Sequence, residues 1–142
     1  MSNIKIIEKM YDEIKIGDEA SISKVITDED IVKFSEVSLD KNPLHLDDEF
    51  AEKTIFGKRI AHGFLGASLI SAVLGTKLPG INTIYMSQSL KFLAPVFIGD
   101  ELTATVKASK KRDDKNMITF ETTVVNQDDK KVISGEAIVK KD

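Results

Sequence analysis

The chain has 142 residues, of which 42% are hydrophobic and 30% charged, and its formal net charge is −3. This composition fits a single soluble domain, residues 1–142, that can bury roughly two thirds of the surface of its unfolded chain. The mixed charges give no reason to expect nucleic-acid binding, and the absence of cysteine excludes disulfides and thiol catalysis. With two histidines and no cysteine, a protein-bound zinc site is not expected.

The N-terminal residues 1–17 alternate charged and apolar side chains and lack the apolar core of a signal peptide. The longest uncharged run, residues 60–76, is too short and too rich in small residues to span a bilayer comfortably. We therefore expect a cytoplasmic protein with no membrane partner. Residues 1–14 are expected to form a loosely ordered extension.

The first predicted strand covers residues 19–26, where apolar and polar residues are interleaved. Thr27 then has the position of a helix N-cap, and the acidic residues that follow it favour a helix start. Apolar residues at spacings of three and four predict an amphipathic helix that runs to about Val37. A second short helix, residues 48–53, is predicted with Asp47 as its cap.

The stretch 61–78 is apolar on almost every side, so it predicts a helix that other elements must enclose. Its small residues let neighbours approach closely, and Leu78-Pro79-Gly80 ends it. From there the pattern has period two, with turn residues between four predicted strands: residues 84–93, 101–111, 117–125 and 132–139. Their short turns predict an antiparallel meander. The expected fold class is α+β, a curved antiparallel sheet of about five strands wrapped around one long buried helix.

A carboxylate and an imidazole flank an Asn-Pro turn in Asp40-Lys41-Asn42-Pro43-Leu44-His45. Across such a turn, Asp40 and His45 could hold one water molecule between them. The N–H of Gly63, at the start of the apolar helix, could stabilise an oxyanion because early helical N–H groups lack partners. An acid, an imidazole and an oxyanion donor are the groups needed for the addition of water to an activated double bond. Each residue taken singly also has a structural explanation. Asp40 and Asn42 are of types that are common in turns, and a histidine such as His45 is often a buried hydrogen-bonding residue. For His62 we expect a packing or capping role.

Two positions on the apolar helix are candidates for a substrate pocket. Ser71 could bond to its own helix backbone or line a pocket beside an acyl chain. Leu74, almost one turn further along, could belong to the core or to the pocket wall.

These motifs resemble those of the MaoC-like, (R)-specific enoyl-CoA hydratase family, hydratase 2. The likeness covers roughly residues 15–140 and extends to Leu78-Pro79-Gly80, Gln88-Ser89-Leu90-Lys91-Phe92 and Gly135-Glu136-Ala137. The resemblance implies a hot-dog fold, a homodimer and cofactor-free hydration of trans-2-enoyl thioesters to (R)-3-hydroxyacyl thioesters. It also implies that Asp40 and His45 are the catalytic pair and that Ser71 lines the acyl pocket.

One position departs from the family pattern. The family usually has glycine directly before the catalytic aspartate, and this chain has Leu39. Glycine would permit a positive φ, so leucine predicts an ordinary backbone here and a slightly shifted carboxylate.

Three alternatives remain open beside an acyl-CoA hydratase. A 3-hydroxyacyl-ACP dehydratase would share the fold and dock an acidic carrier protein on a basic patch, for which Lys107, Lys110, Lys111 and Arg112 are candidates. A hot-dog thioesterase would place water against the carbonyl carbon and has no obvious need of an Asp–His pair. A non-catalytic acyl-CoA-binding module would lack the acid or the histidine, and both are present.

Overall fold

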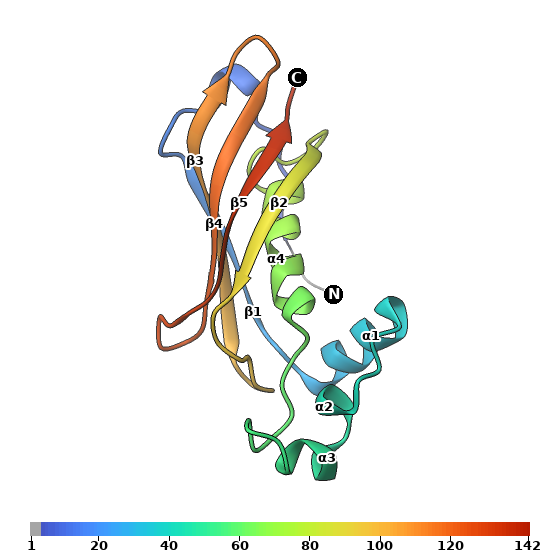
Figure 1. The fold of residues 1–142 in the computed structure, drawn as a ribbon. Coiled ribbons are helices and arrows are strands. Elements are labelled where there is room, and N and C mark those ends of the chain that lie inside the picture. Colours follow the sequence, from blue (N-terminus) through green and yellow to red (C-terminus); the bar gives the residue numbers. More distant parts are fainter. Residues whose placement is uncertain (1–3) are drawn as a thin grey trace.

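The fold is a single antiparallel sheet that curves around a long helix (Figure 1). The computed structural model describes residues 4–142. The sheet has five strands in the order β1-β3-β4-β5-β2, and the helix is α4 (Gly63–Thr76). The strands are β1 (Glu19–Val25), β2 (Ile84–Phe92), β3 (Glu101–Arg112), β4 (Met117–Val125) and β5 (Lys131–Lys140). The predicted fold class is confirmed, and the predicted elements lie within about two residues of the observed ones.

The core lies between the concave face of the sheet and α4. Every second residue is buried from Leu102 to Ala108 in β3 and from Ile118 to Val124 in β4, as expected for a sheet with one covered face. From α4, the buried residues include Leu65, Leu69, Ile70, Val73 and Leu74. One stripe of α4 is not covered: Phe64, Ser68, Ser71 and Gly75 are all exposed. Within the described chain, the apolar helix is therefore enclosed on all sides but one.

The strand order corrects the predicted meander. Only β3, β4 and β5 follow one another as neighbours, whereas β2 pairs with β5 and β1 occupies the place beside β3. The connection after β2, residues 93–100, crosses the end of the sheet and forms a bridge between Phe97 and Ile60. The meander prediction failed because turn residues report that the chain changes direction, not which strand lies beside which.

Three short helices lie beyond the end of the sheet, next to the start of α4 (Figure 1). They are α1 (Asp28–Ser38), α2 (Pro43–Leu46) and α3 (Asp48–Glu52). Thr27 caps α1 through a reciprocal bond with Asp30, and Asp47 caps α3. The sequence did not predict α2, because four residues are too few to show helical periodicity.

The N-terminal segment packs against the C-terminal end of α4. The Ile7 N–H donates to the Thr76 carbonyl over 2.9 Å, and Tyr11 and Ile14 are buried. The short 3-10 helix η1 (Tyr11–Glu13) lies in this segment. Residues 7–14 are thus packed on the domain rather than loosely ordered as expected. Residues 1–3 of the same predicted extension lie outside the described part of the chain. Among residues 4–142 there is no helix with the length and apolar character needed to cross a membrane.

Candidate active site

The loop between α1 and α2 sets the position of Asp40. Its N–H donates to Ser38 Oγ over 3.1 Å, and its own Oδ1 accepts from the Asn42 N–H over 3.3 Å. Leu39, the C-cap of α1, has a φ of 67° in the left-handed region, so the expectation of an ordinary backbone at Leu39 was wrong. The turn from helix to loop requires this conformation whichever residue is present, as in many helix C-termini.

His45 is oriented by a main-chain carbonyl. Asn42 caps α2, with its Oδ1 accepting from the Leu44 N–H over 3.1 Å, and Pro43 occupies the first helical turn. The imidazole of His45 is 8% exposed, and its Nδ1 lies 2.8 Å from the Ile60 carbonyl oxygen. Because a carbonyl only accepts, Nδ1 carries the proton, and Nε2 of a neutral ring keeps a free lone pair.

His62 stacks on His45 at the start of α4. The two ring centroids are 3.9 Å apart and the planes are inclined by 28°, while Phe34 packs on His62 at 4.9 Å. Its Nε2 donates to the Asp40 carbonyl oxygen over 2.9 Å. His62 occupies the N-cap position of α4, but its side chain makes no capping bond, so of the two expected roles packing applies. Burial lowers the pKa of His62 below its ordinary value of 6.5, and the Asp40 carbonyl opposes the shift only partly.

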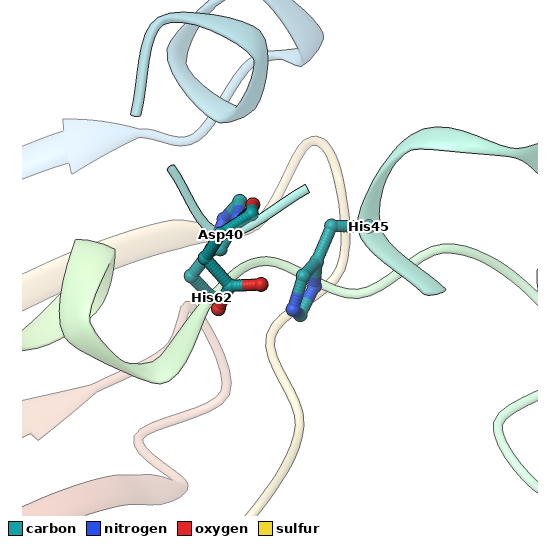
Figure 2. Close-up of side chains that lie close together, drawn as sticks. All are labelled: Asp40, His45 and His62. Atoms are coloured by element: carbon teal, nitrogen blue, oxygen red, sulfur yellow. Dashed lines mark hydrogen bonds between the residues drawn. The ribbon is translucent and has the colours of Figure 1, made fainter. Parts of the chain in front are cut away.

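Asp40, His45 and His62 converge from three places in the chain (Figure 2). One carboxylate oxygen of Asp40 and one nitrogen of each imidazole all lie within 4.8 Å of one another. The two histidines are buried and Asp40 is exposed, so the cluster opens toward solvent on the side of the acid. The stacked rings do not suit one metal ion, because nearly parallel planes keep their in-plane lone pairs from converging on a single point. The arrangement suits a bound water better.

Gly63 is the first residue of α4 and is exposed. Its N–H is one of the early helical donors that have no partner in the helix. A Cβ at this position would lie 2.6 Å from Phe92 Cε1, so glycine allows the aromatic ring to approach the helix start. The oxyanion role of Gly63 stays a prediction, with the geometry in keeping with it.

Two apolar grooves meet at the start of α4. The first, of about 480 Å³, is lined by His62, Gly63, Phe56 and Pro95 among others. The second, of about 710 Å³, runs between α4 and β2 and includes Ser68 and Ser71. Phe64 and Phe92 line both grooves.

The two predicted substrate-binding residues therefore lie in different surroundings. Ser71 is exposed and lines the second groove. Leu74 is 1% exposed, belongs to the hydrophobic core and lines neither groove. Its contact with substrate stays a prediction that the geometry of the described chain does not favour.

Several residues of the site were not identified from the sequence. The Ile60 carbonyl that orients His45 gives no sequence signal, because every residue has a carbonyl. Phe34 and Phe92 lie in segments that were predicted as a helix and a strand, and Arg59 lies between predicted elements, so none of the three was singled out. The adjacent His62 and Gly63 did give a signal, but their sequence could not reveal that one imidazole lies against the other.

Comparisons with known proteins found matches over most of the chain. Residues 12–130 match the family model described as MaoC like domain. An (R)-specific enoyl-CoA hydratase from Rhodospirillum rubrum is 48% identical, over 98% of this chain and 96% of the relative. The solved (R)-hydratase of Aeromonas caviae, described as involved in PHA biosynthesis, has a TM-score of 0.89 and 43% identity, over 91% of this chain and 98% of that one. The unliganded R-hydratase PhaJ1 of Pseudomonas aeruginosa also has a TM-score of 0.89, with 42% identity over 93% and 84% of the two chains.

Proposed function

This chain belongs to the MaoC-like domain family, and on that premise we propose that it is an (R)-specific enoyl-CoA hydratase. It adds water reversibly to a trans-2-enoyl-CoA and yields the (R)-3-hydroxyacyl-CoA. The observation that carries the proposal is the convergence of Asp40 and His45, with a free lone pair on Nε2 of His45, beside the exposed start of α4.

The reaction needs a positioned water molecule. Asp40 and the Nε2 of His45 each accept a hydrogen bond from it, which aims its oxygen at C3 of the enoyl group. As the C3–O bond forms, the π electrons move toward the thioester oxygen. The proton that leaves the water passes to the Asp40–His45 pair, and the pair returns a proton to C2 on the same face. Atoms and charge balance without a cofactor.

The negative charge on the thioester oxygen needs a donor in place before the reaction. The Gly63 N–H supplies it from the start of α4, where the helix dipole also favours negative charge. Loss of one such donor typically costs about 3 kcal/mol of transition-state stabilisation.

The acyl chain has room in the groove between α4 and β2. Its lining is apolar apart from Ser68, Ser71 and the polar groups of β2, which suits a short aliphatic chain. Ser71 contacts this chain directly in our proposal, while Leu74 supports the wall from the core. The first groove, which reaches His62 and Gly63, then receives the thioester end.

We also propose a homodimer that pairs through β2. This strand is at one edge of the sheet, and edge strands are usually covered or paired. Ile84, Met86 and Phe92 of β2 are each at least half exposed, as is Phe64 on the open stripe of α4. A second copy on this edge would enclose the stripe and form one wall of the groove.

CoA is the carrier that we favour over acyl carrier protein. The candidate basic patch lies on β3, and its hairpin end is at the far end of the sheet from α2 and the start of α4 (Figure 1). Lys111 there donates to the carbonyls of Tyr11 and Ile14, and Arg112 pairs with Asp114. Both cations thus have partners within the chain. The cytoplasm remains the proposed compartment.

One assay tests the function and its alternatives together. The purified protein is mixed with crotonyl-CoA while the absorbance of the conjugated thioester and the release of free thiol are both followed. A hydratase lowers the absorbance without releasing thiol. Thiol release would indicate a thioesterase, and no change in either signal would indicate a binding module; both outcomes contradict the proposal.

A further inference from the structure

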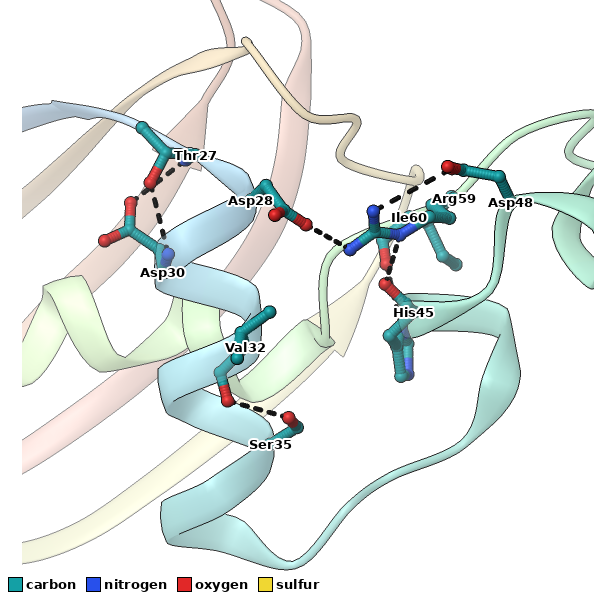
Figure 3. A network of polar contacts seen from close by, with 9 residues as sticks. All are labelled: Thr27, Asp28, Asp30, Val32, Ser35, His45, Asp48, Arg59 and Ile60. Carbon is teal, nitrogen blue, oxygen red and sulfur yellow. Dashed lines mark hydrogen bonds and ion pairs between the residues drawn. The ribbon is translucent and has the colours of Figure 1, made fainter.

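The Arg59 side chain contacts one residue in each of the three short helices α1, α2 and α3 (Figure 3). Its side chain is only 11% exposed, although it lies in a connection. The Nε–H donates to the His45 carbonyl oxygen over 2.7 Å. Nη2 donates to Asp28 Oδ1, and Nη1 lies 3.8 Å from Asp48 Oδ1.

The three partners of Arg59 all lie at helix ends. Asp28 and Asp48 are the first residues of α1 and α3, and His45 lies in the last turn of α2. The final carbonyls of a helix have no partner in the helix, so an external donor satisfies the His45 carbonyl. A guanidinium has several donors in one plane, and its fork reaches all three groups at once. A lysine ammonium is a single point charge and does not reproduce that fork.

The segment that contains Arg59 holds His45 at two points. The Arg59 side chain binds the His45 main-chain carbonyl, and the next residue, Ile60, accepts the proton of His45 Nδ1. This segment is itself fastened to the connection after β2, because the Ala61 N–H donates to the Val96 carbonyl over 2.7 Å. The main chain and the ring of His45 are therefore both hydrogen-bonded to the same segment, residues 59–60.

We propose that Arg59 is a positioning residue for the hydration reaction. By holding the His45 carbonyl, it keeps the Nδ1–H bonded to Ile60 and so keeps Nε2 as the lone-pair nitrogen that accepts from water. Arg59 lines neither groove and acts only through His45. This inference rests on the proposed function for its effect on rate, but its effect on the histidine ring can be measured independently.

The test compares R59Q and R59K with a matched control, K33Q. Lys33 forms an ion pair with Glu29 on the exposed face of α1, so its loss removes a cation near the same helices without touching His45. We expect R59Q to lower kcat on crotonyl-CoA by about 10- to 100-fold with a change in KM of less than about threefold, as for other residues that orient a functional histidine. R59K should recover only part of this loss, and K33Q should match the original protein.

Histidine ¹⁵N NMR supplies the second readout, since the chain has two histidines that H45Q and H62Q assign. In the original protein His45 should be protonated on Nδ1 and His62 on Nε2. R59Q should turn the His45 signal into a mixture of tautomers and leave His62 unchanged. A folded R59Q with normal kcat, or with lower kcat and an unchanged His45 tautomer, would overturn the inference.

The NMR result also separates this inference from the proposed function. If the original protein does not hydrate crotonyl-CoA, the tautomer change in R59Q still supports the positioning role, and its absence still refutes it. Circular dichroism and Tm establish that each variant is folded. Should R59Q not fold, Asp28→Asn removes one anchor of the same guanidinium and is subjected to the same two readouts.

Discussion

His45 and His62 lie face to face, with ring centroids 3.9 Å apart, although 16 residues lie between them in the sequence. Burial lowers the pKa of His62, and a charge on His45 would act in the same direction. The stack therefore places the imidazole that we propose as catalytic, His45, against an imidazole whose burial disfavours its charged form, His62.

The lowered pKa of His62 makes stability depend on pH. At pH well above 6.5 His62 is neutral in the folded and unfolded states, so its protonation does not reduce the free energy of unfolding there. As the pH falls below 6.5, the unfolded chain binds the proton first, and the free energy of unfolding decreases until the folded pKa is passed. Urea titrations from pH 7.5 to 5 should show this decrease, and H62Q should show a flatter profile. An equally steep profile in H62Q would assign the dependence to another group.

The proposed catalytic pair, Asp40 and His45, is tested by D40N and H45Q. Each change keeps the size of the side chain and removes a proton acceptor, so we expect kcat on crotonyl-CoA to fall by about 10²- to 10⁴-fold. The matched control is E36Q, which changes an exposed acid on α1. Near-normal rates in both site variants, measured by the same absorbance assay, would contradict the assignment.

The groove between α4 and β2 is tested at Ser71. Replacement by Phe fills the groove that we propose for the acyl chain, so kcat/KM for C8 and longer enoyl-CoA substrates should fall about tenfold or more relative to the C4 substrate. S71A removes the hydroxyl without filling the groove and should keep the chain-length profile. If S71F keeps it too, the acyl chain binds elsewhere.

Leu39 has a left-handed backbone that costs a non-glycine residue about 1–2 kcal/mol. Replacement by glycine should therefore raise the free energy of unfolding by about 1 kcal/mol, after allowance for the greater freedom of the unfolded chain. The side chain is 78% exposed, so little packing is lost. Denaturant titration measures the gain, and L39A, which keeps the unfavourable φ, should show none.

Gly135 lets β5 lie close to β2. A Cβ there would come within 1.9 Å of the Ser89 carbonyl oxygen, so G135A must push the edge strand away. We expect a loss of stability of about 1–3 kcal/mol and, because β2 is the proposed dimer edge, a shift toward monomer in size-exclusion chromatography. G75A is the control for stability alone, because nothing lies within 4 Å of a Cβ at that position, whereas Gly75 itself lies on the stripe that the second copy would cover. A stable, dimeric G135A would contradict both expectations.

The sequence predicted most of the elements because their signals are local. Residues 117–125 alternate with period two, and Thr27 marks a helix start whatever the rest of the chain does. The partner of β2 was predicted wrongly because strand neighbours are decided by the path of a distant connection. The backbone at Leu39 was predicted wrongly because residue preference was allowed to outweigh the geometry that a helix end requires.

The candidate site likewise has residues that local sequence could identify and contacts that it could not. Asp40, His45 and Gly63 could be selected from their types and order, and their roles remain predictions. The stacking of His62 and the bond to the Ile60 carbonyl depend on how the loop before α4 folds back on α2, which no local pattern reports. Leu74 shows the limit of a helical spacing argument: a residue almost one turn from Ser71 faces the core rather than the groove.

The contact between Gly63 and Phe92 has a consequence for how this site can vary. Because Phe92 Cε1 lies only 2.6 Å from where a Cβ would stand, a side chain at position 63 requires the half-exposed Phe92 ring to move away. A smaller residue at position 92 removes the need for that movement, so substitutions at the two positions should compensate each other. G63A should accordingly lower the free energy of unfolding more on its own than in combination with F92L. A library that varies positions 63 and 92 together should therefore contain folded variants that a library of position 63 alone lacks.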